Sequence, residues 1–280
     1  MKLFFQILIF VGFCFAKLLQ PINNPEIEIL EINGKNREYF ISRGNDLIYE
    51  IEGPKLVLLT SRKPIPKRYN EKVNIKFSIH LKGAEKVPHK GNLEISNIVH
   101  SIKHPAHAYT KSEQIYINIP TGSHLLNIRS EKDPVLFRLT TKKKPKRKKT
   151  DSVLSSNCGE PIKVITGKRS KDYSIIQSQN EGFFNLSDDK LLWLYIRGVH
   201  TNTDFLPIIL NYNKPHKDEF QKIIFYSEPS SVSIAEGIEN KIGKLRTFPI
   251  PISDGYEELI IENLSEIDVL IHGGFIQKSE

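Results

Sequence analysis

Three histidines lie close enough in the sequence to form a metal site. His100, His104 and His107 give the pattern H-x3-H-x2-H, and neutral imidazole is a good ligand for zinc or copper. On a helix His100 and His104 would share one face, but Pro105 and the strand-like surroundings argue against a helix. Isolated loop histidines are the alternative. We keep the three as candidate ligands, although the sequence as a whole predicts neither a metal nor another cofactor.

Two segments carry enough positive charge to bind an anionic partner. One is a loop directly after an apolar strand, with Lys63, Lys67 and Arg68. The other is the run KKKPKRKK, whose basic residues are Lys142, Lys143, Lys144, Lys146, Arg147, Lys148 and Lys149. Near an anionic membrane, each basic residue of such a run contributes about 1 kcal/mol of attraction. The alternative is a solvated spacer with no partner.

Two arginines occur at matching places in a repeated segment. Arg62 ends the segment KLVLLTSR and Arg197 ends the segment KLLWLYIR, 135 residues later. We expect each guanidinium to pair with a carboxylate inside its own half, a structural role that needs no ligand. Trp193 matches the position of Leu58, so we expect it to fill the core and not to form a platform for a sugar ring.

Motifs of known enzyme classes are missing from the sequence. It contains no G-x-S-x-G, no H-E-x-x-H, no P-loop and no dinucleotide-binding fingerprint. After removal of a leader, Cys158 is the single cysteine, so no internal disulfide can form. The sequence therefore predicts a protein without catalytic activity. A hydrolase whose site residues meet only in the folded chain is the alternative.

The first sixteen residues, MKLFFQILIFVGFCFA, resemble a secretory signal peptide. A lysine precedes a short apolar run that closes on Cys14-Phe15-Ala16, a pattern suited to cleavage after residue 16. Lipidation of Cys14 is a second option. The rest of the sequence has no apolar stretch long enough for a membrane span. We predict an exported protein that is periplasmic, at the cell surface or secreted.

The net charge of +8 hides an uneven distribution. Residues 17–141 hold 19 basic and 13 acidic side chains, whereas residues 150–280 hold 13 basic and 19 acidic ones. The remaining excess lies in the basic run and in the leader. A uniformly basic surface for nucleic acid is therefore not expected. The first half is basic and the second half is acidic.

Short strands separated by turns fill both halves, and the halves repeat each other. Residues 115–122 parallel residues 248–255 at an offset of 133, and the last apolar strands, at 135–139 and 269–272, also match. Alternating apolar residues indicate strands throughout. We predict an all-β fold of two tandem antiparallel β-sandwich, jelly-roll-like domains related by internal duplication. The boundaries are 1–16 signal peptide, 17–141 basic domain, 142–156 linker and 157–280 acidic domain.

Three functions are compatible with this sequence. The first is an exported, non-catalytic binding or assembly protein of the cell envelope that contacts a protein or an anionic glycan or polymer through its first half and linker. The second is a pair of carbohydrate-binding or adhesin-type modules that use loops at one end of each sandwich. The third is the hydrolase mentioned above. No specific nucleic-acid partner is expected, and the sequence does not define an oligomeric state.

Overall fold

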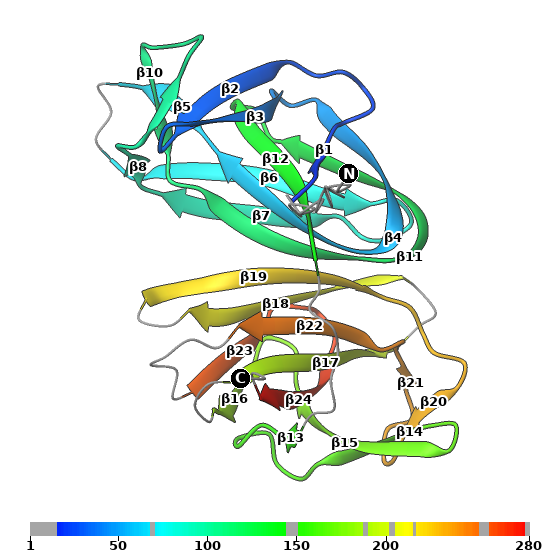
Figure 1. The fold of residues 1–280 in the computed structure, drawn as a ribbon. Helices are drawn as coiled ribbons and strands as arrows, with labels where there is room; N and C mark the ends of the chain where they lie inside the picture. The colour runs from blue at the N-terminus through cyan, green and yellow to red at the C-terminus, as the bar shows by residue number, and fades with distance from the viewer. Residues whose placement is uncertain are drawn as a thin grey trace, which may run out of the picture.

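The computed structural model describes residues 16–67, 71–143, 151–186, 190–201, 205–214, 217–251 and 258–277. In these residues the chain is built of β-strands, as predicted (Figure 1). The strands of the first half are β1 (Leu18–Leu19), β2 (Ile27–Ile32), β3 (Lys35–Ser42), β4 (Asp46–Arg62), β5 (Pro64–Pro66), β6 (Val73–Leu81), β7 (Val87–Leu93), β8 (Ile95–Ser96), β9 (Val99–Ser101), β10 (His107–Thr110), β11 (Glu113–Ser130) and β12 (Val135–Lys142).

The second half contains the strands from β13 onward. They are β13 (Asp151–Val153), β14 (Ile162–Thr166), β15 (Arg169–Ile176), β16 (Glu181–Asn185), β17 (Lys190–His200), β18 (Leu206–Lys214), β19 (Lys217–Ser227), β20 (Ser233–Ala235), β21 (Lys241–Ile242), β22 (Arg246–Pro251), β23 (Glu258–Asn263) and β24 (Val269–Gln277). None of the described segments forms a helix that could span a lipid bilayer.

Two long strands build both sheets of the first sandwich. In one sheet, the second part of β4 pairs with the first part of β11 and with β12. In the other sheet, the first part of β4 pairs with the second part of β11. This part of β11 also pairs with β6, and β6 pairs with β7. The pairing register shifts between Ile119 and Gly122, where the strands pass from one sheet to the other. Apolar residues of both sheets meet in one core between them.

The second half repeats this pairing in the same register, which confirms the internal duplication. Ile115 of β11 faces Leu59 of β4, and Phe248 of β22 faces Leu194 of β17. The offsets between these residues are the 133 and 135 found in the sequence. The pairs β2–β3, β2–β9 and β6–β7 recur as β14–β15, β14–β20 and β18–β19. The chain is a tandem of two antiparallel β-sandwiches.

The repeat extends to individual polar contacts. Lys111 and Glu94 form an ion pair of 2.6 Å, and their counterparts Lys244 and Glu228 form one of 2.5 Å. Each half can therefore serve as an internal reference for the other. A position at which the two halves differ marks a residue that the shared strand pairing does not depend on.

One strand is shared between the two sandwiches. β19 ends a sheet of the second half and also pairs in parallel with β11 of the first half, from Ile115↔Lys222 to Asn118↔Phe225. Figure 1 shows β19 lying directly below β11, along the boundary of the two halves. The hydrogen-bonded sheet therefore continues from one half into the other.

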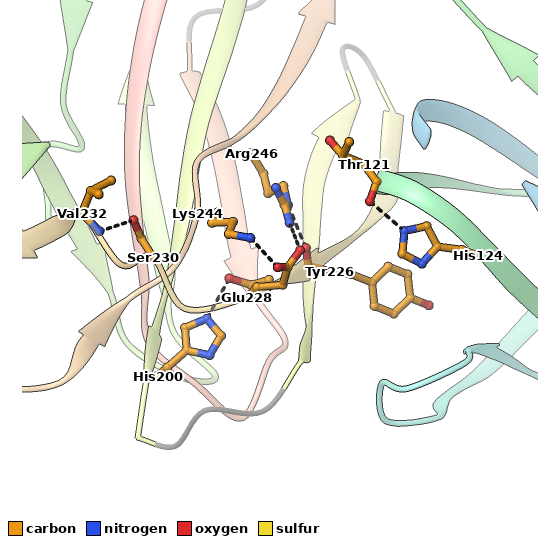
Figure 2. Close-up of polar contacts among 10 residues, drawn as sticks. Thr121, His124, His200, Tyr226, Glu228, Ser230, Val232, Lys244 and Arg246 are labelled. Atoms are coloured by element: carbon orange, nitrogen blue, oxygen red, sulfur yellow. Dashed lines mark hydrogen bonds and ion pairs between the residues drawn. The ribbon is translucent and has the colours of Figure 1, made fainter. Parts of the chain in front are cut away.

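Side chains of β19 alternate between the two cores. Ile223 and Phe225 pack in the core of the second half, whereas Ile224 and Tyr226 pack in the core of the first half. Figure 2 shows the Tyr226 side chain directed toward His124 on β11, away from the Glu228 ion pairs. Because the first core contains side chains of the second half, the two sandwiches are packed as one body.

Candidate functional site

The structure brings two of the three candidate histidines together. The rings of His104 and His107 stack with a centroid distance of 5.5 Å and an interplanar angle of 25°. His100 lies apart from them on β9, where it is exposed and faces Glu31 of β2. Among the described residues, no group of three or more His, Cys, Asp or Glu side chains could hold a metal ion.

A buried carboxylate holds His104 in place. Glu28 is 2% exposed; one carboxylate oxygen accepts a hydrogen bond from the Ser101 hydroxyl, and the other lies 2.8 Å from Nδ1 of His104. Tyr109 is buried beside them, and burial, with the nearby Glu28 charge, raises the pKa of Tyr109 above its usual value. We call Glu28, Ser101 and His104 the Glu28 cluster.

Glu28 and His104 of this cluster line a cavity of about 250 Å³. Strand pairing creates this cavity, because β10 aligns His107 with Pro66 and Tyr109 with Pro64 of β5. Two segments that the sequence analysis treated separately, the histidines and the basic loop, thus form one site. The lining residues are Glu28, Ile41, Arg43, Pro64, Ile65, Pro66, His104, His107, Tyr109, Pro134 and Leu136.

The basic loop contributes less free charge than the sequence suggested. The Lys63 ammonium is 2.5 Å from Asp133 and also donates to the carbonyl oxygen of Asn74. Lys67 is exposed, and Arg68 lies outside the described residues. Of the basic run, Lys142 is the last residue of β12 and Lys143 is exposed. The other five, Lys144, Lys146, Arg147, Lys148 and Lys149, are outside the described residues, as are residues 1–15 of the predicted signal peptide.

A basic face that the sequence analysis missed lies on the outer side of the first sandwich. Lys76 of β6 stands directly opposite Lys90 of β7, and Arg129 follows on the next strand, β11. All three side chains are exposed. Lys76 is 3.9 Å from Glu131, and no ion pair of Lys90 or Arg129 occurs among the described residues. We call Lys76, Lys90 and Arg129 the basic face.

The second half has other residues at the places of the basic face. The counterparts of Lys76 and Lys90 are Ile209 and Ile224, which pair with each other on β18 and β19, and the counterpart of Arg129 is Glu262. Like charges directly opposite each other on a sheet are destabilising. In the second half this face is covered, because Ile224 lies in the core of the first half and Ile209 packs against that core. The cations therefore occur where the same sheet face is exposed, and the alternation of Lys76 with inward-facing Ile75 and Phe77 was the signal available in the sequence.

The prediction that Arg62 and Arg197 pair with carboxylates was wrong. Arg62 donates to the Thr110 carbonyl oxygen at 2.6 Å and to the Tyr39 hydroxyl at 3.3 Å. Arg197 donates to the Gly243 carbonyl oxygen at 2.9 Å and also to the hydroxyls of Ser233 and Thr166. Both side chains are buried, and Thr110 and Gly243 are counterparts in the repeat. Both arginines thus donate to neutral oxygens at equivalent places of the repeat, and the buried Nε of Arg197 has no hydrogen-bond partner among the described residues.

Trp193 is buried in a core, as the sequence analysis expected. Trp193 is 2% exposed and belongs to a core cluster of the second half. Cys158 is a free, partly exposed thiol whose Sγ lies 3.1 Å from the Ser155 hydroxyl.

A serine–histidine pair in the second half does not have the access that a hydrolase site needs. Nε2 of His200 lies 2.8 Å from the Ser227 hydroxyl, but the two residues are 1% and 0% exposed. A Cβ atom on Gly243 would lie 2.3 Å from that hydroxyl, so the pair is enclosed by the backbone. A substrate cannot reach this hydroxyl, and the pair is a packing contact.

Comparisons with known proteins do not define a family for this chain. No protein-family model and no curated protein sequence matches it. Among solved structures, the tandem CBM22-1–CBM22-2 domains of Xyn10C from Paenibacillus barcinonensis align over 95% of this chain and 98% of theirs, with 9% identity and a TM-score of 0.24.

Two further solved structures give similar values. The M60 catalytic domain with the CBM51-1 and CBM51-2 domains of Clostridium perfringens ZmpB aligns over 94% of this chain and 37% of its own, with 8% identity and a TM-score of 0.24. The ANX2 ectodomain from Arabidopsis thaliana aligns over 94% and 95%, with 9% identity and a TM-score of 0.23. Likeness at this level does not bear on what the chain binds.

Proposed function

We propose that this chain is an exported, non-catalytic binding or assembly protein of the cell envelope that holds an anionic partner on its first half. The observation that carries the proposal is the basic face of Lys76, Lys90 and Arg129. These exposed cations stand on neighbouring strands of a sheet face that is open to solvent. The equivalent face of the second half packs against the first half through two isoleucines at the positions of Lys76 and Lys90. An anionic partner would offset their mutual repulsion.

The rigid sheet suits this role. The basic face lies on regular paired strands, so its charges are held at fixed spacing before a partner arrives. Directly opposite side chains in a sheet have Cβ atoms about 5 Å apart, a spacing at which one anionic chain can contact several of them. The basic run, which follows β12 in the sequence, adds positive charge between the two halves, and the acidic second half would repel an anionic partner. The leader sequence supports export.

Reversing two charges of the basic face should weaken binding to an anionic polysaccharide. In the double variant Lys90→Glu and Arg129→Glu, we expect the affinity for heparin, used as a probe, to fall by roughly thirtyfold, or about 2 kcal/mol at about 1 kcal/mol for each lost cation. Surface plasmon resonance at constant ionic strength measures this change. Both side chains are exposed, so stability should change by less than about 0.5 kcal/mol for each substitution.

A matched control separates the basic face from net charge. Lys168→Glu with Lys241→Glu makes the same change of charge at exposed positions of the second half and should retain most of the affinity. Equal losses in both double variants would mean that only net charge matters, and an unchanged affinity in the first would refute the basic face as the binding surface.

A further inference from the structure

The Glu28 cluster has no polar counterpart in the second half. Ile162 faces Tyr173 as Glu28 faces Tyr39, and Ala235 takes the place of Ser101. The same strand pairing therefore forms with apolar side chains at these positions. Removing a carboxylate from water costs free energy even when it is hydrogen-bonded. The strand pairing does not require this carboxylate, and Glu28 lines the cavity described above.

Glu28 determines which nitrogen of His104 faces a ligand. When Glu28 is ionised it can only accept hydrogen bonds, and Nδ1 of His104, at 2.8 Å, is then the hydrogen-bond donor. In the neutral ring, Nε2 on the opposite side is then an acceptor with a fixed direction. The His104 side chain is 43% exposed and lines the cavity, and no hydrogen bond to its Nε2 occurs among the described residues.

The cavity combines apolar walls with a few polar groups. Pro64, Pro66, Ile41 and Leu136 form apolar walls, and Arg43 adds donors. The Arg43 guanidinium has a loose, exposed ion pair of 3.4 Å with Glu26, so it can turn toward a ligand. The volume of about 250 Å³ lies below the range of about 300–1,000 Å³ that is usual for drug-sized ligands. Its occupant is therefore about the size of a single ring.

We propose that this cavity binds one sugar residue, whose hydroxyl donates to Nε2 of His104. The remaining hydroxyls of a sugar can accept from Arg43, and its C–H face can pack against the prolines. This chemistry matches a site with an oriented acceptor, a donor and apolar walls. The site is separate from the basic face and does not depend on the anionic partner proposed above.

The second half provides a variant that tests this site. Glu28→Ile, Ser101→Ala and His104→Ile introduce the residues found at the equivalent offsets in the second half. The probes are glucose, galactose, mannose and N-acetylglucosamine, titrated at millimolar concentrations and followed by NMR of the histidine ring protons and by calorimetry. We expect the native chain to bind at least one of them. The triple variant should bind it about tenfold or more weakly, as is usual when hydrogen-bonding partners are lost, with an equal or higher melting temperature.

Controls keep the outcomes apart. His100→Ala changes an exposed histidine outside the cavity and should bind the sugar like the native chain. If the triple variant does not fold, His104→Ala, at a partly exposed side chain, should show the same loss. Failure of all four sugars to bind, or binding that survives His104→Ala, would overturn the proposal. Heparin binding should be the same in all these variants, so failure of this site and failure of the basic face are distinguishable.

Discussion

Ile224→Ala is expected to lower the free energy of unfolding of the whole chain by about 2–5 kcal/mol. Ile224 is 0% exposed and lies on β19, in the second half of the sequence, yet its side chain packs in the core of the first half. Truncation leaves a cavity at the place where the two sandwiches join. Because β19 also pairs with both β11 and β18, both halves should lose stability together.

Urea denaturation followed by two probes measures this effect. Trp193 fluorescence reports on the second half, where Trp193 is buried, and far-UV circular dichroism reports on all strands. Both should give one shared transition. Ile224→Val should cost only about 0.5–1.5 kcal/mol, and Lys90→Ala, at the exposed counterpart, less than about 0.5 kcal/mol. A loss below about 1 kcal/mol for Ile224→Ala, or two separate transitions, would contradict the shared core.

Acidification is expected to destabilise the fold well above the pH at which carboxylates protonate. Burial, with the Lys222 ammonium nearby, lowers the pKa of His89 to about 3, and burial, with Lys171 nearby, lowers the pKa of His272 to about 4. In the unfolded chain both would take up protons near pH 6.5. At pH values between 6.5 and these lowered pKa values, the unfolded state binds more protons than the folded state. The free energy of unfolding therefore falls as the pH falls. Each histidine should contribute about 1.4 kcal/mol per pH unit.

The structure explains why both histidines stay neutral. Lys222 Nζ lies 3.2 Å from Nδ1 of His89, so the ammonium donates to the ring and would repel an imidazolium; Glu113, 3.7 Å from Nε2, is too distant for a hydrogen bond. His272 lies between the rings of Tyr173 and Tyr195. Urea midpoints between pH 7 and about pH 4.5 measure the slope. His272→Phe should reduce the slope by about half, whereas equal stability at both ends of this range would contradict buried neutral histidines.

The sequence was sufficient to predict the duplicated β-sandwich fold, because strand alternation and constant offsets both depend on local pattern. Leu58 and Leu59 pair with Tyr116 and Ile115 of β11. Their counterparts Trp193 and Leu194 pair with Pro249 and Phe248 of β22, so the pairing repeats at the offsets of 135 and 133 found in the sequence. The sharing of β19 was not predicted. The sequence feature that indicates it is the run Ile223-Ile224-Phe225-Tyr226 of β19, since consecutive apolar residues are typical of a strand that is buried on both faces.

The site was harder to predict than the fold, because its residues meet only through strand pairing. Glu28 lies in the segment IEILEI and is buried, while its neighbour Ile27 is 39% exposed, the reverse of what their polarity suggests. The approach of β10 to β5 joins the histidines to the loop with Lys63, and no spacing in the sequence encodes that approach. The same reason explains the error on Arg62, whose carbonyl partner on Thr110 carries no side-chain signal.

The salt dependence of heparin binding by the intact chain tests the proposed function most directly. If exposed cations of the first half hold an anionic partner, the logarithm of the affinity should fall linearly with the logarithm of the salt concentration between about 50 and 500 mM sodium chloride, and the slope should become smaller in Lys90→Glu with Arg129→Glu. A native chain that binds equally at both ends of that range, or does not bind at low salt, would contradict the proposed function.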